Sequence, residues 1–312
     1  MLRLPKRLLA LLLAATAALW LFGERGRLLL PSSLRMMRAG GRRQFLNGLH
    51  GYVYGRWTNQ YINVLIHQVT PRLGENGKKW LSDRYHGKIL THDQAESIVN
   101  LEHDIPLTDL EQIVPYPMAR SIVLNASPDV AAYECSCRHA RANPCQPTQV
   151  CMVVGREPVD FILEHNPQSS RRLSQEEALQ ILKEEHERGH VHSAWFKDAI
   201  LDRFYVICNC CKCCCGGIEA MMKHGVPMLA SSGYVANIDV AACNGCGICI
   251  EPCPFAALSL QGELASVKWG SCMGCGVCTG QCPLDAVSLV RDELKGMPLD
   301  VTSLAPVIAR DW

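Results

Sequence analysis

Two stretches near the carboxyl end repeat one cysteine pattern: Cys243-Asn-Gly-Cys246-Gly-Ile-Cys249-Ile-Glu-Pro-Cys253-Pro254 and Cys272-Met-Gly-Cys275-Gly-Val-Cys278-Thr-Gly-Gln-Cys282-Pro283. Each reads C-x2-C-x2-C-x3-C-P, and the second follows the first at an offset of 29 residues. Two residues between successive thiolates let a loop wrap three corners of one inorganic core. The proline after the fourth cysteine cannot extend a helix. This doubled pattern decides the fold of its part of the chain.

The spacing is the ligand rule for two [4Fe–4S] clusters, in which each cluster takes three cysteines from one stretch and its fourth from the other. By that rule one cluster binds Cys243, Cys246, Cys249 and Cys282. The other binds Cys272, Cys275, Cys278 and Cys253. Glycines between the cysteines let the backbone turn tightly and bring its N–H groups near the sulfides. A zinc ribbon is the alternative, because paired C-x2-C also binds zinc, but eight cysteines in doubled order favour iron and sulfide.

The flanks of the repeat have strand-like patterns. Short strands are predicted at Tyr234–Asp239, Ala257–Gln261, Ala265–Trp269 and Ala286–Val290, which makes two β–loop–α–β halves related by a pseudo-twofold axis. With these flanks, residues 233–291 resemble the bacterial two-cluster ferredoxins. The resemblance implies a ferredoxin-like fold, two [4Fe–4S] clusters and one-electron transfer, and it implies no particular partner.

Ten further cysteines lie in two runs ahead of this repeat. The first run opens with Cys135-Ser-Cys137-Arg138-His139 and continues to Cys145 and Cys151. The second reads Cys208-Asn-Cys210-Cys211-Lys-Cys213-Cys214-Cys215-Gly216-Gly217. Crowded free thiols oxidise one another unless they are bound, so ordinary buried side chains are a poor explanation. Adjacent cysteines also rarely meet disulfide geometry, and we therefore predict that all ten are metal ligands.

The metal of this second group stays open, because soft thiolates bind iron–sulfur clusters, zinc and copper(I). The many C-C and C-x-C pairs suit a copper store, whereas the neighbouring repeat favours a further iron–sulfur centre, and there are enough thiols for a non-cubane cluster. Four ligands come either from Cys135, Cys137, Cys145 and Cys151 or from a mixture of both runs. Arg138, Lys212 and His192 are candidates to tune such a centre or to meet an anionic substrate.

The order of these motifs resembles that of a family of bacterial and archaeal 4Fe–4S dicluster-domain proteins. Those proteins carry a C-x-C-R segment, a C-N-C-C-x-C-C-C run and then the ferredoxin repeat, which correspond here to residues 135–138, 208–215 and 243–283. The resemblance covers roughly residues 130–291 and implies an iron–sulfur cofactor. It implies no reaction.

The amino-terminal segment is basic and apolar. Residues 1–43 carry nine Lys or Arg and one Glu, so the rest of the chain is acidic although the formal net charge of the whole is +1. The uncharged run Leu8–Phe22 is short for a membrane span of about 20 residues, so a signal anchor, an interfacial helix and a cleaved signal peptide are all open. More basic residues follow the run than precede it, which favours an anchor with the body of the protein in the cytoplasm.

These patterns predict an α+β chain, with a mostly helical amino-terminal and cysteine-rich part before the ferredoxin-like domain. The expected divisions are a membrane anchor or leader (1–43), a helical scaffold (44–130), a cysteine-rich metal domain (131–232), the two-cluster domain (233–291) and a tail (292–312). Capping boxes predict helices after Thr91 and Ser174. We interpret four histidines as ordinary surface or core residues because none has paired ligand spacing: His50, His67, His86 and His92.

The favoured function is electron transfer at the cytoplasmic face of the membrane, in which single electrons pass through the two clusters between a soluble donor and a third metal centre in 135–215. The alternatives are a reductase whose active site is the second cysteine group, and a redox or metal sensor. Whether the chain is an enzyme stays open. We expect redox proteins and, through the amino terminus, the membrane as partners, and no nucleic acid; the sequence sets no oligomeric state.

Overall fold

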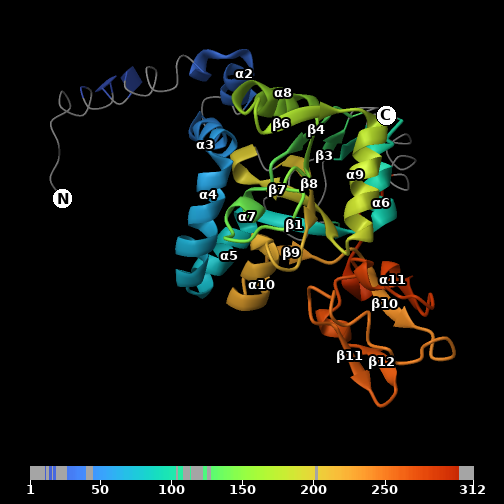
Figure 1. Ribbon diagram of the computed structural model, residues 1–312. Helices are drawn as coiled ribbons and strands as arrows, with labels where there is room; N and C mark the ends of the chain where they lie inside the picture. Colours follow the sequence, from blue (N-terminus) through green and yellow to red (C-terminus); the bar gives the residue numbers. More distant parts are fainter. Residues whose placement is uncertain are drawn as a thin grey trace.

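A seven-stranded sheet forms the centre of the larger part of the protein (Figure 1). The computed structural model describes residues 11, 14–15, 17–18, 27–39, 45–102, 105–107, 113, 122–124, 128–200 and 203–301. In sheet order, the strands are β6 (Ser170–Leu173), β4 (Val130–Tyr133), β5 (Cys151–Val154), β8 (Arg203–Cys210), β7 (Val191–Lys197), β1 (Tyr85–Leu90) and β9 (Leu229–Ala230). Neighbours run antiparallel except β1 and β9, which are parallel.

Helices cover both faces of this sheet, which makes three layers (Figure 1). One face packs against α6 (His92–Val99) and α9 (Gln175–Glu187), whose buried side chains share a core with β4 and β7. The other face packs against α3 (Phe45–Arg56), α4 (Thr58–Val64), α7 (Ser136–His139), α8 (Arg156–His165) and α10 (Gly216–His224). The remaining elements of this part are η1 (Arg27–Leu29), α2 (Pro31–Ala39), η2 (Leu65–Val69), η3 (Thr70–Arg72), α5 (Glu75–Arg84), η4 (Asp198–Ile200) and the β2 (Ile105–Leu107) and β3 (Ile122–Leu124) pair.

This sheet corrects the expectation of a mostly helical cysteine-rich part, while the broad α+β class is confirmed. Except for β6, these strands are buried at nearly every position, so they lack the alternation of apolar and polar residues by which a strand is recognised. All seven residues of β7 are buried, including His192, Ser193 and Lys197. The predicted scaffold 44–130 and metal domain 131–232 share the sheet, because β1 pairs with β7.

Two helices begin where their capping boxes predict. Thr91 caps α6 and Ser174 caps α9, and in each case the side chain three residues later bonds back to the backbone of the cap. This reciprocal bonding satisfies two of the free backbone N–H groups at a helix start. Both helices lie on the face of the sheet opposite to the cysteines of β8.

The carboxyl-terminal part is a small domain of paired short strands (Figure 1). Its elements are β10 (Tyr234–Ile238), β11 (Leu258–Gln261), β12 (Leu264–Val267), η5 (Trp269–Ser271), α11 (Val277–Gly280), β13 (Val287–Arg291) and η6 (Glu293–Lys295). The first strand pairs with the last and the two middle strands pair with each other, all antiparallel. The four strands lie within one or two residues of the predicted positions.

The backbone of this domain repeats at the same offset as its sequence. Ala256 and Asp285 are the only described residues other than glycine with a positive φ, at 49° and 50°, and they occupy equivalent places after each Cys-Pro pair. The hydrogen bond from Asp239 N–H to Ala286 O has its counterpart in the bond from Lys268 N–H to Ala257 O. Donor and acceptor in the second bond are the residues equivalent to those of the first, with the two halves interchanged. The domain therefore has the pseudo-twofold arrangement that the repeated sequence predicts.

The two parts are joined by several polar contacts and by the segment after β13. Gln281 Nε2 donates to Glu187 O at 3.2 Å, and the buried Lys88 Nζ donates to Met297 O at 2.7 Å. Leu299 and Val301, from the predicted tail, are fully buried in the core beneath α6 and α9.

The predicted membrane anchor falls mostly outside the described residues. Within the residues that the structure describes, no helix has both the length and the apolar character needed to cross a membrane. Only five positions of the run Leu8–Phe22 are described.

Candidate metal centres

Two small cavities in the carboxyl-terminal domain are each lined by four cysteines. One is lined by Cys243, Cys246, Cys249 and Cys282. The other is lined by Cys253, Cys272, Cys275 and Cys278. In each cavity three thiols come from one motif and the fourth from the other, so the structure brings together the same sets that the spacing rule predicts.

Electrostatic coupling between the thiols largely follows the same division, although Cys249 also acts on Cys278 of the other set. Burial raises the pKa of the Cys249 thiol, and charge on Cys282, Cys246 and Cys243 raises it further. Burial likewise raises the pKa of Cys275 to about 12, with contributions from Cys253 and Cys272. Thiols that resist ionisation in their own apolar pocket become good ligands when a cation replaces the protons.

Backbone geometry in both motifs suits a cofactor held at close range. Gly245 has a φ of +71°, and an added Cβ would lie 2.0 Å from Glu263 O; Gly274 has a φ of +63°, and an added Cβ would lie 2.2 Å from Tyr234 O. No other residue fits there, so each loop can fold tightly around its pocket. Ala236 N–H donates to Cys272 Sγ at 3.4 Å, and Ala257 N–H donates to Cys253 Sγ at 3.3 Å. N–H···S bonds of this kind raise the reduction potential of a thiolate-bound cluster.

The ten remaining cysteines divide into a group of six and a group of four. The six, which we call the thiol ring, are Cys135, Cys137, Cys151, Cys208, Cys210 and Cys215. Their side chains contact one another in a closed circle: 135 with 137, 137 with 215, 215 with 210, 210 with 208, 208 with 151, and 151 with 135. The Cys215 and Cys210 sulfurs are 3.2 Å apart.

Four elements place the thiol ring on one face of the sheet. Cys208 and Cys210 are two residues apart on β8, so their side chains point the same way, and Cys151 comes from the adjacent β5. Cys135 and Cys137 lie at the start of α7, and Cys215 caps α10. Glycines follow Cys215 because the neighbours are close: a Cβ on Gly217 would lie 2.4 Å from the Trp195 ring.

The thiol ring faces an apolar cavity of about 120 Å³. All six thiols line the cavity, together with Trp195 and four tyrosines: Tyr133 and the hydrogen-bonded Tyr54, Tyr85 and Tyr205. The Tyr54 hydroxyl lies 2.7 Å from that of Tyr205 and 3.1 Å from that of Tyr85. Burial raises the pKa of each tyrosine, so the phenols stay protonated. Sequence reasoning missed this cluster, for which the alternation of aromatic and glycine residues in 49–57 was the only signal.

Within the thiol ring, the thiols differ in acidity. Hydrogen bonds from Cys208 and then Cys215 lower the pKa of Cys210 to about 6, whereas hydrogen bonds to Cys151 first and Cys210 second raise the pKa of Cys208. One thiolate is therefore stabilised by its neighbours, while the others keep their protons. A metal that binds all six must displace those protons, so its binding strengthens as the pH rises.

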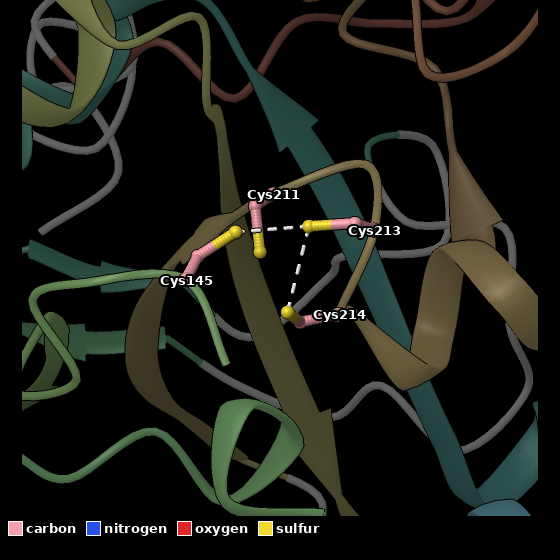
Figure 2. A group of neighbouring side chains, drawn as sticks. All are labelled: Cys145, Cys211, Cys213 and Cys214. Carbon is pink, nitrogen blue, oxygen red and sulfur yellow. Dashed lines mark hydrogen bonds between the residues drawn. The ribbon is translucent and has the colours of Figure 1, made fainter. Parts of the chain in front are cut away.

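The second group, which we call the thiol quartet, is made by Cys145, Cys211, Cys213 and Cys214 (Figure 2). Their sulfurs all lie within 4.8 Å of one another, and Cys145 Sγ is 2.9 Å from Cys213 Sγ. A tetrahedral ion with bonds of about 2.3 Å to sulfur holds its thiolates about 3.8 Å apart. The spacing therefore fits a single ion better than a cube, which binds each thiolate at a different iron corner.

The structure divides the ten cysteines of the second field between two groups. Cys145 joins the second run and does not lie with Cys135, Cys137 and Cys151, so each group mixes both runs. Lys212, between two quartet cysteines, is exposed, and its Nζ donates to Glu251 O in the first ferredoxin-like motif. The quartet thus adjoins the carboxyl-terminal domain. Together the four sets account for all eighteen cysteines, each of which is a free thiol.

Arg138 is completely buried between the two groups of thiols. Its Nη2 donates to Glu185 Oε2 at 2.7 Å. Burial alone would lower the pKa of Arg138, but Glu185 outweighs burial and raises it; charge on Cys211 and Cys135 acts in the same direction. Burial would raise the pKa of Glu185, but hydrogen bonds from His190 and Arg138 lower it. Arg138 is therefore a fixed positive charge beside the thiols, and it lines the same cavity as the thiol ring.

Comparison with known protein families agrees with the carboxyl-terminal geometry. Residues 235–283 match the model of the 4Fe-4S dicluster domain family. A comparison with curated proteins found no match. The match and the geometry of these residues define an iron–sulfur module of the ferredoxin-like class, and they support a role in electron transfer.

We predict that Cys253→Ala and Cys282→Ala remove different clusters. Cys253 lies with the second motif, so its replacement disturbs the cluster bound by Cys272, Cys275 and Cys278, and Cys282→Ala disturbs the other. Electron paramagnetic resonance of the reduced proteins checks this, because each variant keeps the signal that the other loses. Loss of the same signal from both variants would contradict the pairing.

We predict that Arg138→Met destabilises the protein by about 1.5–3 kcal/mol, because it removes the buried cation that donates to Glu185 and leaves that carboxylate with His190 and Arg188 alone. The matched control is Arg171→Met, which breaks an exposed pair with Glu177 and costs less than about 1 kcal/mol. Urea denaturation of the anaerobic protein measures both.

The pKa of Glu185 is lowered on folding, so the contribution of the buried pair to stability is present above the ordinary glutamate pKa of about 4.3. This contribution is lost as the pH falls through the lower pKa of the folded state. Equal effects of the two substitutions at neutral pH would contradict the assignment.

Proposed function

We propose that this protein transfers single electrons from a soluble donor through two [4Fe–4S] clusters to a third, polynuclear iron–sulfur centre held by the thiol ring. The observation that carries the proposal is the closed circle of six buried or half-buried thiols on one face of the sheet. When bound, such clusters supply one-electron chemistry that side chains alone lack. The protein contributes the ligands, their spacing and an apolar surround.

The number and arrangement of thiols favour a polynuclear centre in the ring. One tetrahedral ion takes four thiolates, so six in a closed circle exceed the need of a single zinc or iron. Soft thiolates in an apolar pocket select iron–sulfur or copper(I), and the ferredoxin-like domain on the same chain favours iron and sulfide. The cavity beside the ring offers about 120 Å³ into which a cluster can extend.

The thiol quartet has a different part in this proposal, as the site of one ion that fixes the loop between β8 and α10. Two of its members, Cys211 and Cys214, also line the cavity of the ring. Lys212 lies in the same loop and contacts the segment between Cys249 and Cys253, because its Nζ donates to Glu251 O. A bound ion would therefore hold the thiol ring close to the ferredoxin-like clusters. Rapid electron transfer requires such a short distance between the centres.

A reductase is the second candidate, and the cavity beside the ring is the observation that favours it. A centre open on one side to an apolar cavity could bind a substrate, such as a disulfide or a quinone. The hydroxyls of Tyr54, Tyr85 and Tyr205 stay protonated there and can donate hydrogen bonds that orient such a substrate. In this case the two clusters deliver the electrons to the active site.

We predict that anaerobically purified protein contains more iron and sulfide than the roughly eight of each that two cubes account for. Cys210→Ser should lower iron and sulfide to that level while it leaves the quartet ion in place. Cys213→Ser should remove one zinc or iron ion and leave the sulfide unchanged. Iron, zinc and sulfide are quantified together on each protein, and each variant is the control for the other. A wild-type count that stops at two cubes, without zinc, would show that the third centre is wrong.

The electron route is tested on the same proteins. Reduction by a ferredoxin-type donor should bleach the signal of the ring centre in the wild type, and Cys275→Ser should slow that bleaching, because the route begins in the ferredoxin-like domain. Unchanged kinetics in Cys275→Ser would contradict the route. A change in the ring signal on adding a disulfide or a quinone would favour the reductase, and its absence would favour the electron carrier.

We further propose that residues 1–43 attach the protein to the cytoplasmic face of the membrane. Their excess of basic residues supports attraction to anionic headgroups, and the apolar run supports insertion. Deletion of residues 1–26, which keeps α2 packed on α3 and α8, should therefore move the protein from the membrane to the soluble fraction on centrifugation of lysed cells. A lysis buffer of high salt is the control for purely electrostatic attachment. Unchanged partitioning of the shortened chain would remove the anchor from the proposal.

A further inference from the structure

Three histidines meet on the face of the sheet opposite to the thiol ring. His92 lies in α6, His186 in α9 and His192 in β7, and their candidate ligand nitrogens are all within 4.8 Å of one another. His192 is fully buried, while the other two are partly exposed. Sequence spacing gives no sign of this group, because its members come from three elements that only the fold brings together.

Hydrogen bonds fix the protons on two of the three rings. Asn209 donates its Nδ2 to Val150 O at 2.7 Å, so its Oδ1 accepts from His192 Nδ1 at 2.6 Å. His92 Nε2 lies 3.2 Å from Glu96 Oε1, which only accepts, so the ring donates from that nitrogen. In the neutral rings, the lone pairs therefore lie on His192 Nε2 and His92 Nδ1.

These two lone-pair nitrogens face each other at 3.3 Å. Two lone pairs at this distance repel each other unless a cation lies between them. A tetrahedral ion with bonds of about 2.0–2.1 Å to nitrogen holds two imidazole nitrogens about 3.3–3.4 Å apart. The observed separation therefore suits a shared metal ion. A carboxylate or an amide on the far nitrogen is also the usual support of a metal-bound histidine.

His186 completes the group from α9. Its ring is stacked on His92, with centroids 4.5 Å apart, so it must turn about its Cβ–Cγ bond to direct a nitrogen to the same point. That torsion is soft in histidine. On its other side lies Gly280 of α11, where an added Cβ would be 3.0 Å from His186 Nε2. The group thus adjoins the helix that joins Cys278 to Cys282.

We propose that His92, His186 and His192 bind one divalent transition-metal ion of the zinc class, with a fourth position left for water. Imidazole ligands suit zinc, iron(II), nickel and copper, and three protein ligands with an open position are typical of reactive rather than structural zinc sites. Asn209 and Glu96 are positioning residues that orient two of the ligands. The site is independent of the thiol ring, so the two proposals stand or fall separately.

The test uses zinc as the probe on the full chain, purified anaerobically with its iron–sulfur clusters. X-ray absorption at the zinc edge separates nitrogen ligands, at about 2.0–2.1 Å, from sulfur ligands, at about 2.3 Å. The expected spectrum shows nitrogen ligands, and His92→Gln and His186→Gln both lose them while any sulfur-bound zinc in the quartet stays. Visible absorption of the clusters shows that each variant is folded.

A second variant keeps the test sharp if a ligand substitution unfolds the chain. Glu96 is partly exposed, and Glu96→Gln should weaken zinc binding by about 10–100-fold in chelator competition, because it frees the His92 ring. The matched control is Glu134→Gln, which removes the carboxylate partner of His139 at an unrelated place and should leave the affinity unchanged. The proposal would be overturned if zinc were bound only by sulfur, or if the two substitutions had equal effects. It would also be overturned if His92 and His192 shared a proton in place of zinc.

Discussion

The constraint on which this structure depends is the cost of burying thiolate charge. Eighteen free thiols lie in one chain, most of them buried or half-buried, and an isolated anion in an apolar interior is expensive. The raised pKa values of Cys275, Cys137 and Cys215 show the usual consequence, which is retention of the proton. Binding a cation is the other solution. A protein that gathers thiols in this way must keep each set apart from the others, and the fold does so with a sheet, a small domain and two glycine-rich loops.

Positive charge and backbone N–H groups offset that cost differently in the two parts of the protein. In the carboxyl-terminal domain the donors are backbone amides, such as Ala236 N–H to Cys272 Sγ. In the larger part a whole guanidinium, Arg138, is buried beside both groups of thiols and is neutralised by Glu185. Without a bound metal the ring consists of neutral thiols with one stabilised thiolate at Cys210, so the fold can hold these six side chains without burying six charges.

How much the sequence could predict depends on how local each feature is. The eight ferredoxin-like cysteines lie within 40 residues, and their spacing predicts which of them share a cluster. The domain and its strands could therefore be predicted closely from the sequence. The capping boxes at Thr91 and Ser174 are equally local. The sheet was missed because strands such as β7 are buried at every position and carry histidine, serine and lysine inside the core.

The spacing of the other ten cysteines does not predict which of them join the thiol ring and which the thiol quartet. The pairing of the strands decides this division, and distance along the chain does not. Cys145 meets Cys213 across 68 residues, whereas its nearest neighbour in sequence, Cys151, joins the other group. Successive side chains of β8 point to opposite faces of the sheet, so neighbouring residues of this strand belong to different sites. Cys208 and Cys210 point toward the thiol ring, and Asn209 between them points the other way and orients His192. Three consecutive residues of one strand thus serve two sites on opposite faces, so a shift of register by a single residue would exchange a thiol for an amide in both.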